Sequence, residues 1–176
     1  MPLTFVSMAF LVLSTYMANG FSGLFRPGPG SLIAGLVSAL ALYALFFAGG
    51  MATAGLGGFG LGQTQRHEIY SLVVSQSNTL QTRLLLLAFD SVGYESFFRG
   101  ALQRRLSSRL GRNSVFASAV VDAAVHALTL NPLWVATTFV ADVVWGSTYR
   151  YTGDLSASML SHFSWDVLVF ILFPLT

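Results

Sequence analysis

Residues 31–54 read SLIAGLVSALALYALFFAGGMATA, a stretch without a single charge. At a rise of about 1.5 Å per residue, a helix of this length crosses the roughly 30 Å hydrocarbon core of a bilayer. The whole chain has a similar character, because 54% of its 176 residues are hydrophobic and only 9% are charged. An average soluble domain carries about 25% charged residues. The composition therefore predicts one membrane domain covering residues 1–176.

Further apolar segments lie on both sides of this stretch. Together they predict an all-α, polytopic membrane bundle of about six transmembrane helices. The expected spans are residues 3–25, 31–54, 83–106, 114–130, 133–149 and 155–176. The polar segment 63–82 is expected to form a loop and a short interfacial helix. The glycine-rich residues 55–60 are expected to form a loop or a packing contact between small residues.

The arginines predict the orientation in the membrane. All nine basic residues are arginine, and four of them lie in the loop at 104–112. Because positive charge accumulates in cytoplasmic loops, this loop is expected on the cytoplasmic side, where it can also meet anionic lipid headgroups. Arg26 and Arg150 then fall on the same side, and both chain termini face away from the cytoplasm.

Ionisable residues inside the predicted spans are the second decisive feature. They are Asp90, Glu95, Arg99, Asp122, His126, Asp142, His162 and Asp166. Each such group at bilayer depth costs a few kcal/mol, so these groups normally face the bundle interior and serve function. Counting helical rise from the cytoplasmic ends places four of them in one layer, about 11–14 Å deep. The four are Glu95, Asp122, Asp142 and His162. His126 and Asp166 lie about one turn deeper, and Asp90, interpreted as a helix-packing polar group, deeper still.

Spacing adds a second constraint on these groups. Glu95 with Arg99, Asp122 with His126, and His162 with Asp166 are i,i+4 pairs, so each pair shares one helix face. The predicted result is a polar pocket in which a carboxylate and a histidine share a water or bind a divalent metal such as zinc. The candidate metal ligands are His126, His162, Glu95 and Asp122. With no cysteine in the chain, thiolate zinc sites and a cysteine nucleophile are excluded.

Three motifs resemble those of a known family. Residues 94–100 read YESFFRG, which resembles the EExxFRG signature of the CPBP family of intramembrane proteases. This family includes the CAAX prenyl proteases of the Ras-converting type and the bacterial Abi proteins. His126 resembles the histidine of the family's FxxxH motif. Residues 152–166, TGDLSASMLSHFSWD, resemble its TGSLxxxxxxH and HxxxN/D ending. The resemblance covers a core at residues 84–169.

The resemblance implies an intramembrane endopeptidase, with or without a metal, in a prokaryotic cell membrane. It would hydrolyse a peptide bond of a membrane-embedded or lipidated substrate with water activated by a carboxylate and a histidine. The catalytic residues that it implies are Glu95, His126, His162 and Asp166. The supporting residues are Tyr94, Arg99, Asp122 and Asp142. His162 and Asp166 match the family positions that line the cavity and stabilise the oxyanion.

The sequence departs from the family pattern in three places. Tyr94 stands where the family has its first, catalytic glutamate, and a phenol with a pKa near 10 is a poor general base. Asp122 replaces the phenylalanine of FxxxH, and Asp142 occupies a position that is usually small. Either Asp122 or Glu95 takes over as the base beside His126, or proteolysis has been lost and the cavity serves another purpose.

Two functions of other classes therefore stay open. The first is a proteolytically degenerate member that serves as a scaffold or assembly subunit of a membrane complex. The second is a subunit that ligates haem or a chlorophyll-type pigment through His126 or His162. The expected partners are membrane lipids, a lipidated peptide substrate and other membrane subunits, and no nucleic acid.

Overall fold

The computed structural model describes residues 2–55, 63–74 and 79–175, and every regular element within these ranges is helical. The α-helices are α1 (Pro2–Asn19), α2 (Pro29–Gly55), α3 (Gln63–Val74), α4 (Leu80–Glu95), α5 (Arg104–Leu110), α6 (Ser114–His126), α7 (Pro132–Thr152) and α8 (Leu155–Val167). Two π-helical segments, η1 (Ser96–Gln103) and η4 (Leu168–Leu172), join α4 to α5 and extend α8. Two short 3₁₀ segments, η2 (Gly111–Asn113) and η3 (Ala127–Thr129), follow α5 and α6. The all-α prediction is confirmed.

Each predicted span contains a helix, with shifted ends. The span predicted at 83–106 is one helical column running from α4 through η1 into α5. The first helix stops at Asn19, ahead of the predicted end at residue 25, because Gly20 follows with a left-handed φ of 63°. The short helix predicted in the polar segment is α3, and its interfacial location stays a prediction. The predicted glycine-rich loop lies, from residue 56 onward, outside the described residues.

Side-chain caps start the helices that carry the site. The Asn131 carboxamide accepts a hydrogen bond from the Trp134 backbone N–H at 3.0 Å, and Pro132 occupies the first turn of α7. The Asp154 carboxylate caps α8 through the Ser156 N–H at 3.0 Å. It also accepts from the Arg26 N–H at 3.0 Å, so the loop before α2 is fixed to the turn before α8.

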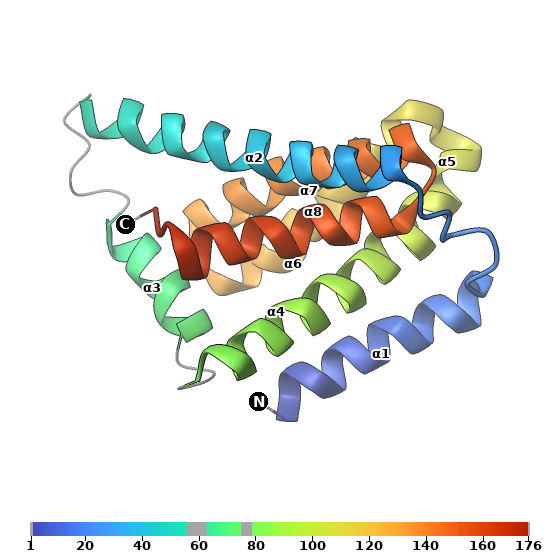
Figure 1. The fold of residues 1–176 in the computed structure, drawn as a ribbon, viewed down its shortest axis with the longest axis horizontal. Coiled ribbons are helices and arrows are strands. Elements are labelled where there is room, and N and C mark those ends of the chain that lie inside the picture. The colour runs from blue at the N-terminus through green and yellow to red at the C-terminus, as the bar shows by residue number, and fades with distance from the viewer. Residues whose placement is uncertain (1, 56–62, 75–78, 176) are drawn as a thin grey trace.

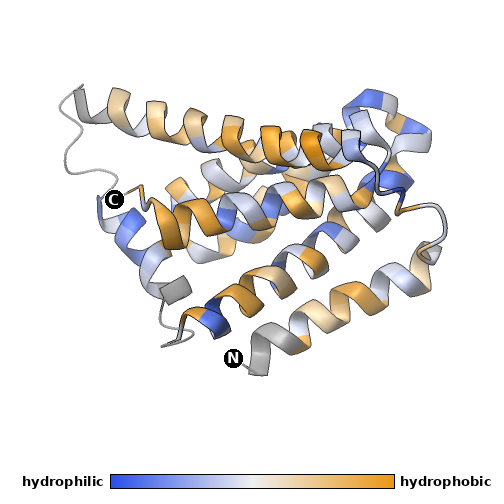
Figure 2. Cartoon of the chain, in the orientation of Figure 1, coloured by the Kyte–Doolittle hydropathy of each residue, from blue (hydrophilic) through white to orange (hydrophobic). Residues whose placement is uncertain are grey.

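Burial in the bundle is the reverse of that in a water-soluble protein. Ionisable side chains such as Arg99 and Glu95 have no exposed surface, whereas large apolar side chains such as Val37 and Leu40 are more than half exposed. Figure 2 shows the same contrast: α2 is mostly hydrophobic, and hydrophilic residues gather at α5 and in the middle of the bundle. Two helices, Pro29–Ala52 and Leu155–Leu172, are long and apolar enough to cross a membrane. The predicted number of six spans stays a prediction.

The arrangement of the helices leaves a polar centre between four elements. In Figure 1, α1 lies beside α4, and α2 lies along α8 with α7 behind it. Helix α3 packs against α7 and η4 at the end of the bundle opposite α5. The column α4–η1 contacts α8, and η1 also contacts α6 and α7. Side chains from α4, α6, α7 and α8 therefore meet in the interior.

Candidate active site

An inner layer of fully buried charges is centred on Arg99. This inner layer consists of Glu95, Arg99, Ser118 and Asp142. The Arg99 Nε donates to Glu95 Oε2 at 3.2 Å, and both terminal nitrogens donate to the Asp142 carboxylate, one at 3.2 Å and one closer. Arg99 also donates to Ser118 Oγ at 3.3 Å. A buried guanidinium is tolerated only when its donors are paired in this way, so the i,i+4 pair predicted within α4–η1 extends across helices to α6 and α7.

The backbone that carries Arg99 is a π-helix. Segment η1 covers Ser96–Gln103 and therefore most of the EExxFRG-like motif. π-Helical turns are frequent at functional sites because the extra residue redirects side chains on the helix surface. Gly100 lies on the outer side of this turn, where an added Cβ would stand 3.2 Å from a Leu24 methyl and 3.3 Å from a Thr15 methyl. The glycine of the motif thus allows η1 to pack closely against the end of α1 and the following loop.

His162 of α8 connects the inner layer to a cavity. Its Nδ1 lies 3.1 Å from Glu95 Oε1, and its Nε2 lies 3.5 Å from Asp166 Oδ2. The Trp145 indole of α7 stacks on the imidazole with the ring centres 3.7 Å apart and the planes inclined by 13°. The ring is therefore held by a carboxylate on each side and by an aromatic face.

Tyr94, Asp122 and His126 form a second connected group. The Tyr94 hydroxyl donates a hydrogen bond to Asp122 Oδ2. The His126 Nδ1 lies 3.2 Å from Asp122 Oδ1 and 3.1 Å from the Asp122 carbonyl oxygen. Two of the three departures from the family pattern, a phenol at position 94 and a carboxylate at position 122, thus bind each other. Asp122 itself is fully buried, behind Tyr94 and His126.

A cavity of about 310 Å³ opens between α4, α7 and α8. Five of the polar residues on its wall are here called the cavity layer: Asp90, Tyr94, His126, His162 and Asp166. The apolar part of the wall includes Met8, Ile69, Leu86, Leu87, Trp134, Ala141, Trp145, Trp165 and Phe170. The charged residue Arg83 also borders the cavity. Glu95, Arg99, Asp122 and Asp142 do not border it. The predicted site residues are therefore brought together, but in two layers, and Glu95 lies in the layer that has no access to the cavity.

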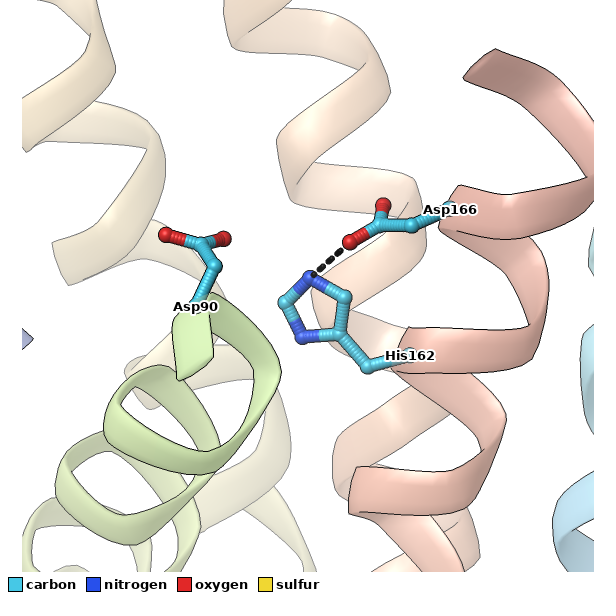
Figure 3. A group of neighbouring side chains, drawn as sticks. All are labelled: Asp90, His162 and Asp166. Atoms are coloured by element: carbon cyan, nitrogen blue, oxygen red, sulfur yellow. Dashed lines mark ion pairs between the residues drawn. The ribbon is translucent and has the colours of Figure 1, made fainter. Parts of the chain in front are cut away.

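Asp90 is the residue that the sequence interpretation missed. It was expected to be a helix-packing group, yet it lies on the cavity wall one helical turn before Tyr94. Figure 3 shows its carboxyl group beside the imidazole of His162, at the same end of the ring as the Asp166 carboxyl group. The i,i+4 spacing between Asp90 and Tyr94 puts both side chains on one helix face, and this spacing is the signal that could have placed Asp90 on the cavity wall.

These three residues also form the group best suited to a metal. Within the described part of the chain, Asp90, His162 and Asp166 are the one set of three whose ligand atoms lie within 4.8 Å of one another. Of the predicted metal ligands His126, His162, Glu95 and Asp122, only His162 belongs to this set. The Glu95 carboxylate is occupied by Arg99 and His162. Asp122 Oδ2 accepts from Tyr94, and Asp122 Oδ1 lies 3.2 Å from His126 Nδ1 but makes no hydrogen bond with the described residues.

Comparison with known proteins identifies the family. The sequence model described as Type II CAAX prenyl endopeptidase Rce1-like matches residues 76–168, just over half of the 176 residues. No curated protein and no solved structure matches the chain. The matched segment runs from the residues before α4 to the start of η4 and so contains both layers of the site. The predicted relationship, based on the motifs around Arg99, His126 and His162, is confirmed: the chain belongs to the Rce1-like family of CAAX prenyl endopeptidases.

Proposed function

We propose that this chain is an intramembrane endopeptidase that hydrolyses a peptide bond of a membrane-embedded or lipidated substrate. The observation that carries the proposal is that His126 and His162 border one cavity, with the Asp122 carboxylate directly behind His126. A carboxylate that holds one ring nitrogen of a histidine leaves the other nitrogen to act as a general base. The family implies prenylated protein substrates, and we extend that substrate class to this chain.

In the proposed reaction, His126 is the base. Its Nδ1 faces Asp122, so Nε2 takes a proton from a water molecule in the cavity as the water oxygen attacks the scissile carbonyl carbon. The carbon–nitrogen bond then breaks, and the proton passes from His126 to the leaving nitrogen. Asp122 stabilises the imidazolium that exists between these two steps.

The developing oxyanion needs hydrogen-bond donors at the same cavity wall. His162 is positioned by Glu95 and Asp166 and stacks on Trp145. The indole N–H groups of Trp145 and Trp165 are buried and, among the described residues, have no hydrogen-bond partner. Donors without a prior partner stabilise a negative charge at little cost in reorganisation.

The proposed setting is a prokaryotic cell membrane, crossed by six helices. The exposed apolar side chains and buried charges support lipid as the surrounding solvent. Contacts of Arg104 with the Ser22 carbonyl and of Arg150 with the Gly111 carbonyl, each at 3.3 Å, gather arginines at one end of the bundle. This supports a cytoplasmic location for the loop at 104–112.

Removing either histidine tests the proposal. His126→Ala and His162→Ala are expected to abolish cleavage of a fluorogenic prenylated peptide, by at least about a thousandfold, because the base or the positioned imidazole is lost. The matched control is His67→Ala, since His67 is an exposed histidine of α3 that does not border the cavity. Folding is checked by circular dichroism in detergent. Full activity in either cavity variant, with folding intact, would rule the proposal out.

One observation favours a second function. Tyr94 replaces the family's first glutamate, and both oxygens of the neighbouring Glu95 are already paired. The other carboxylate of α4, Asp90, lies one helical turn away from position 94. A degenerate member serving as an assembly subunit would have these features. A stoichiometric membrane partner that copurifies with the chain, together with normal cell function in a His126→Ala strain, would support this alternative over hydrolysis.

A further inference from the structure

We propose that Asp90, His162 and Asp166 form a binding site for a divalent first-row metal cation on the wall of the cavity. The three side chains come from two helices, Asp90 from α4 and the other two from successive turns of α8. Their ligand atoms lie within 4.8 Å of one another. Figure 3 shows the two carboxyl groups on either side of the imidazole nitrogen that faces Asp166, so one cation can contact all three side chains.

The hydrogen bond from His162 to Glu95 prepares the imidazole for a metal. Glu95 accepts a hydrogen bond from Arg99, so its carboxylate acts as an acceptor toward His162 as well. The proton of the neutral ring then lies on Nδ1, and Nε2 presents a lone pair toward Asp166 Oδ2 at 3.5 Å. Metal-bound histidines are commonly oriented in this way, by a carboxylate that accepts from the nitrogen opposite the metal. Stacking on Trp145 fixes the ring in the same orientation.

Asp90 supplies the independent reason to expect a cation. Its carboxylate makes no hydrogen bond or ion pair with any of the described residues, although it borders an interior cavity. Every other acidic side chain predicted within the membrane spans has a hydrogen-bond or ion-pair partner. A carboxylate in such a position is costly without a compensating positive charge. A cation held between His162 and Asp166 would lie close enough to compensate the charge of Asp90 as well.

The donor set indicates the kind of cation. One imidazole nitrogen and two carboxylate oxygens suit zinc or manganese, whereas magnesium and calcium prefer ligand sets made only of oxygen. Three protein ligands with one side open to the cavity is the arrangement of catalytic zinc sites, in which the fourth position is left for water or substrate. Binding of the cation is independent of the proposed hydrolysis. Only its use as a Lewis acid toward a substrate carbonyl rests on the proposed function.

Metal titration of the full chain in detergent tests the site. The purified protein is stripped with a chelator, dialysed and titrated with zinc by calorimetry, and with manganese by electron paramagnetic resonance. One cation per chain is expected for the wild type. Asp90→Asn, which keeps the size of the side chain and removes its charge, is expected to lower zinc affinity at least about a hundredfold. Glu95→Gln is expected to lower it by about ten- to a hundredfold, because only the orientation of His162 is lost.

His67→Ala is the matched control, because it removes an exposed histidine from α3 and should leave zinc affinity unchanged. A rise in melting temperature on adding zinc, present in the wild type and absent in Asp90→Asn, gives a second readout that does not depend on activity. No zinc binding by the wild type, or equal affinity in Asp90→Asn, would overturn the inference. Zinc binding that depends on Asp90 without any peptide cleavage would uphold the inference while the proposed function fails. Full cleavage by a stripped wild-type protein that binds no zinc would overturn the inference and leave the proposed function standing.

Discussion

The inner layer and the cavity layer are adjacent, but their polar atoms are satisfied in different ways. In the inner layer, each oxygen of Glu95 and Asp142 has a partner, and all three nitrogens of the Arg99 guanidinium donate. In the cavity layer, Asp90 has no partner among the described residues, and His126 has one nitrogen engaged by Asp122. Charged groups whose polar atoms all have partners stabilise the structure. Charged groups with an unpaired polar atom are available to bind a ligand.

This difference separates two explanations for charges inside a membrane bundle. Paired charges such as Arg99 and Asp142 hold helices together, and their removal should act through folding. Groups that face a cavity, such as His126 and His162, should act on chemistry with little change in stability. The His126→Ala and His162→Ala variants test whether the cavity-facing groups act on chemistry. Variants of Arg99 test whether the paired charges act on folding, and variants of Tyr94 and Asp122 test the boundary between the two layers.

The largest effect on stability is expected for Arg99→Ala. It leaves the Glu95 and Asp142 carboxylates buried without their common donor, and breaking a buried ion pair in this way costs about 3–5 kcal/mol of unfolding free energy. Thermal unfolding in detergent, followed by circular dichroism, measures the loss. The matched control is Arg104→Ala, whose exposed side chain donates to the Ser22 carbonyl and whose loss should cost less than about 0.5 kcal/mol. Equal stability of the two variants would contradict a structural role for the inner layer.

Helical spacing in the sequence predicted much of this site. The pairs Glu95–Arg99, Asp122–His126 and His162–Asp166 are all in contact, because residues four apart share a face whatever surrounds the helix. Depth estimates also brought Glu95, Asp142 and His162 to one level. They could not predict which of these side chains meet, because partners such as Arg99 and Asp142 depend on how each helix is rotated about its axis.

The position of Asp90 was missed for a different reason. Its depth was counted from Arg104 with the rise of an α-helix, but the eight residues of η1 in between are π-helical. A π-helix has more residues per turn and therefore advances less per residue, so the count overestimated the depth of every residue before it. In the structure, ligand atoms of Asp90, His162 and Asp166 lie within 4.8 Å of one another. The existence of a π-helix was not readable from residues 96–103.

The boundary between the layers is tested by restoring the family's glutamate. Tyr94→Glu alone places a second carboxylate against Asp122 and should reduce cleavage about tenfold or more, because two adjacent buried carboxylates cannot both be charged. The double variant Tyr94→Glu/Asp122→Phe carries the family pattern at both positions. It is expected to recover cleavage to within about threefold of the wild type, since coupled residues compensate for each other.

The matched control for this pair is Asp122→Phe alone, which removes the carboxylate behind His126 and should be as inactive as His126→Ala. Peptide cleavage is measured with each variant at equal folded concentration. An increase of cleavage above the wild-type rate in Tyr94→Glu alone would contradict a working role for Asp122. Such an increase would identify the wild-type chain as an inactivated protease.

The smallest effect is expected for Tyr94→Phe, which removes one hydroxyl and preserves the ring packing on Phe98. Asp122 Oδ2 then loses its donor while the carboxylate keeps its contact with His126, so the loss should be about 1 kcal/mol, or roughly fivefold in cleavage rate. The rate of peptide cleavage and the melting temperature in detergent are measured together. If the phenol only orients Asp122, both quantities fall slightly. If Tyr94→Phe is as inactive as His126→Ala with an unchanged melting temperature, the hydroxyl itself takes part in the reaction, and Tyr94 belongs with the histidines as a catalytic residue.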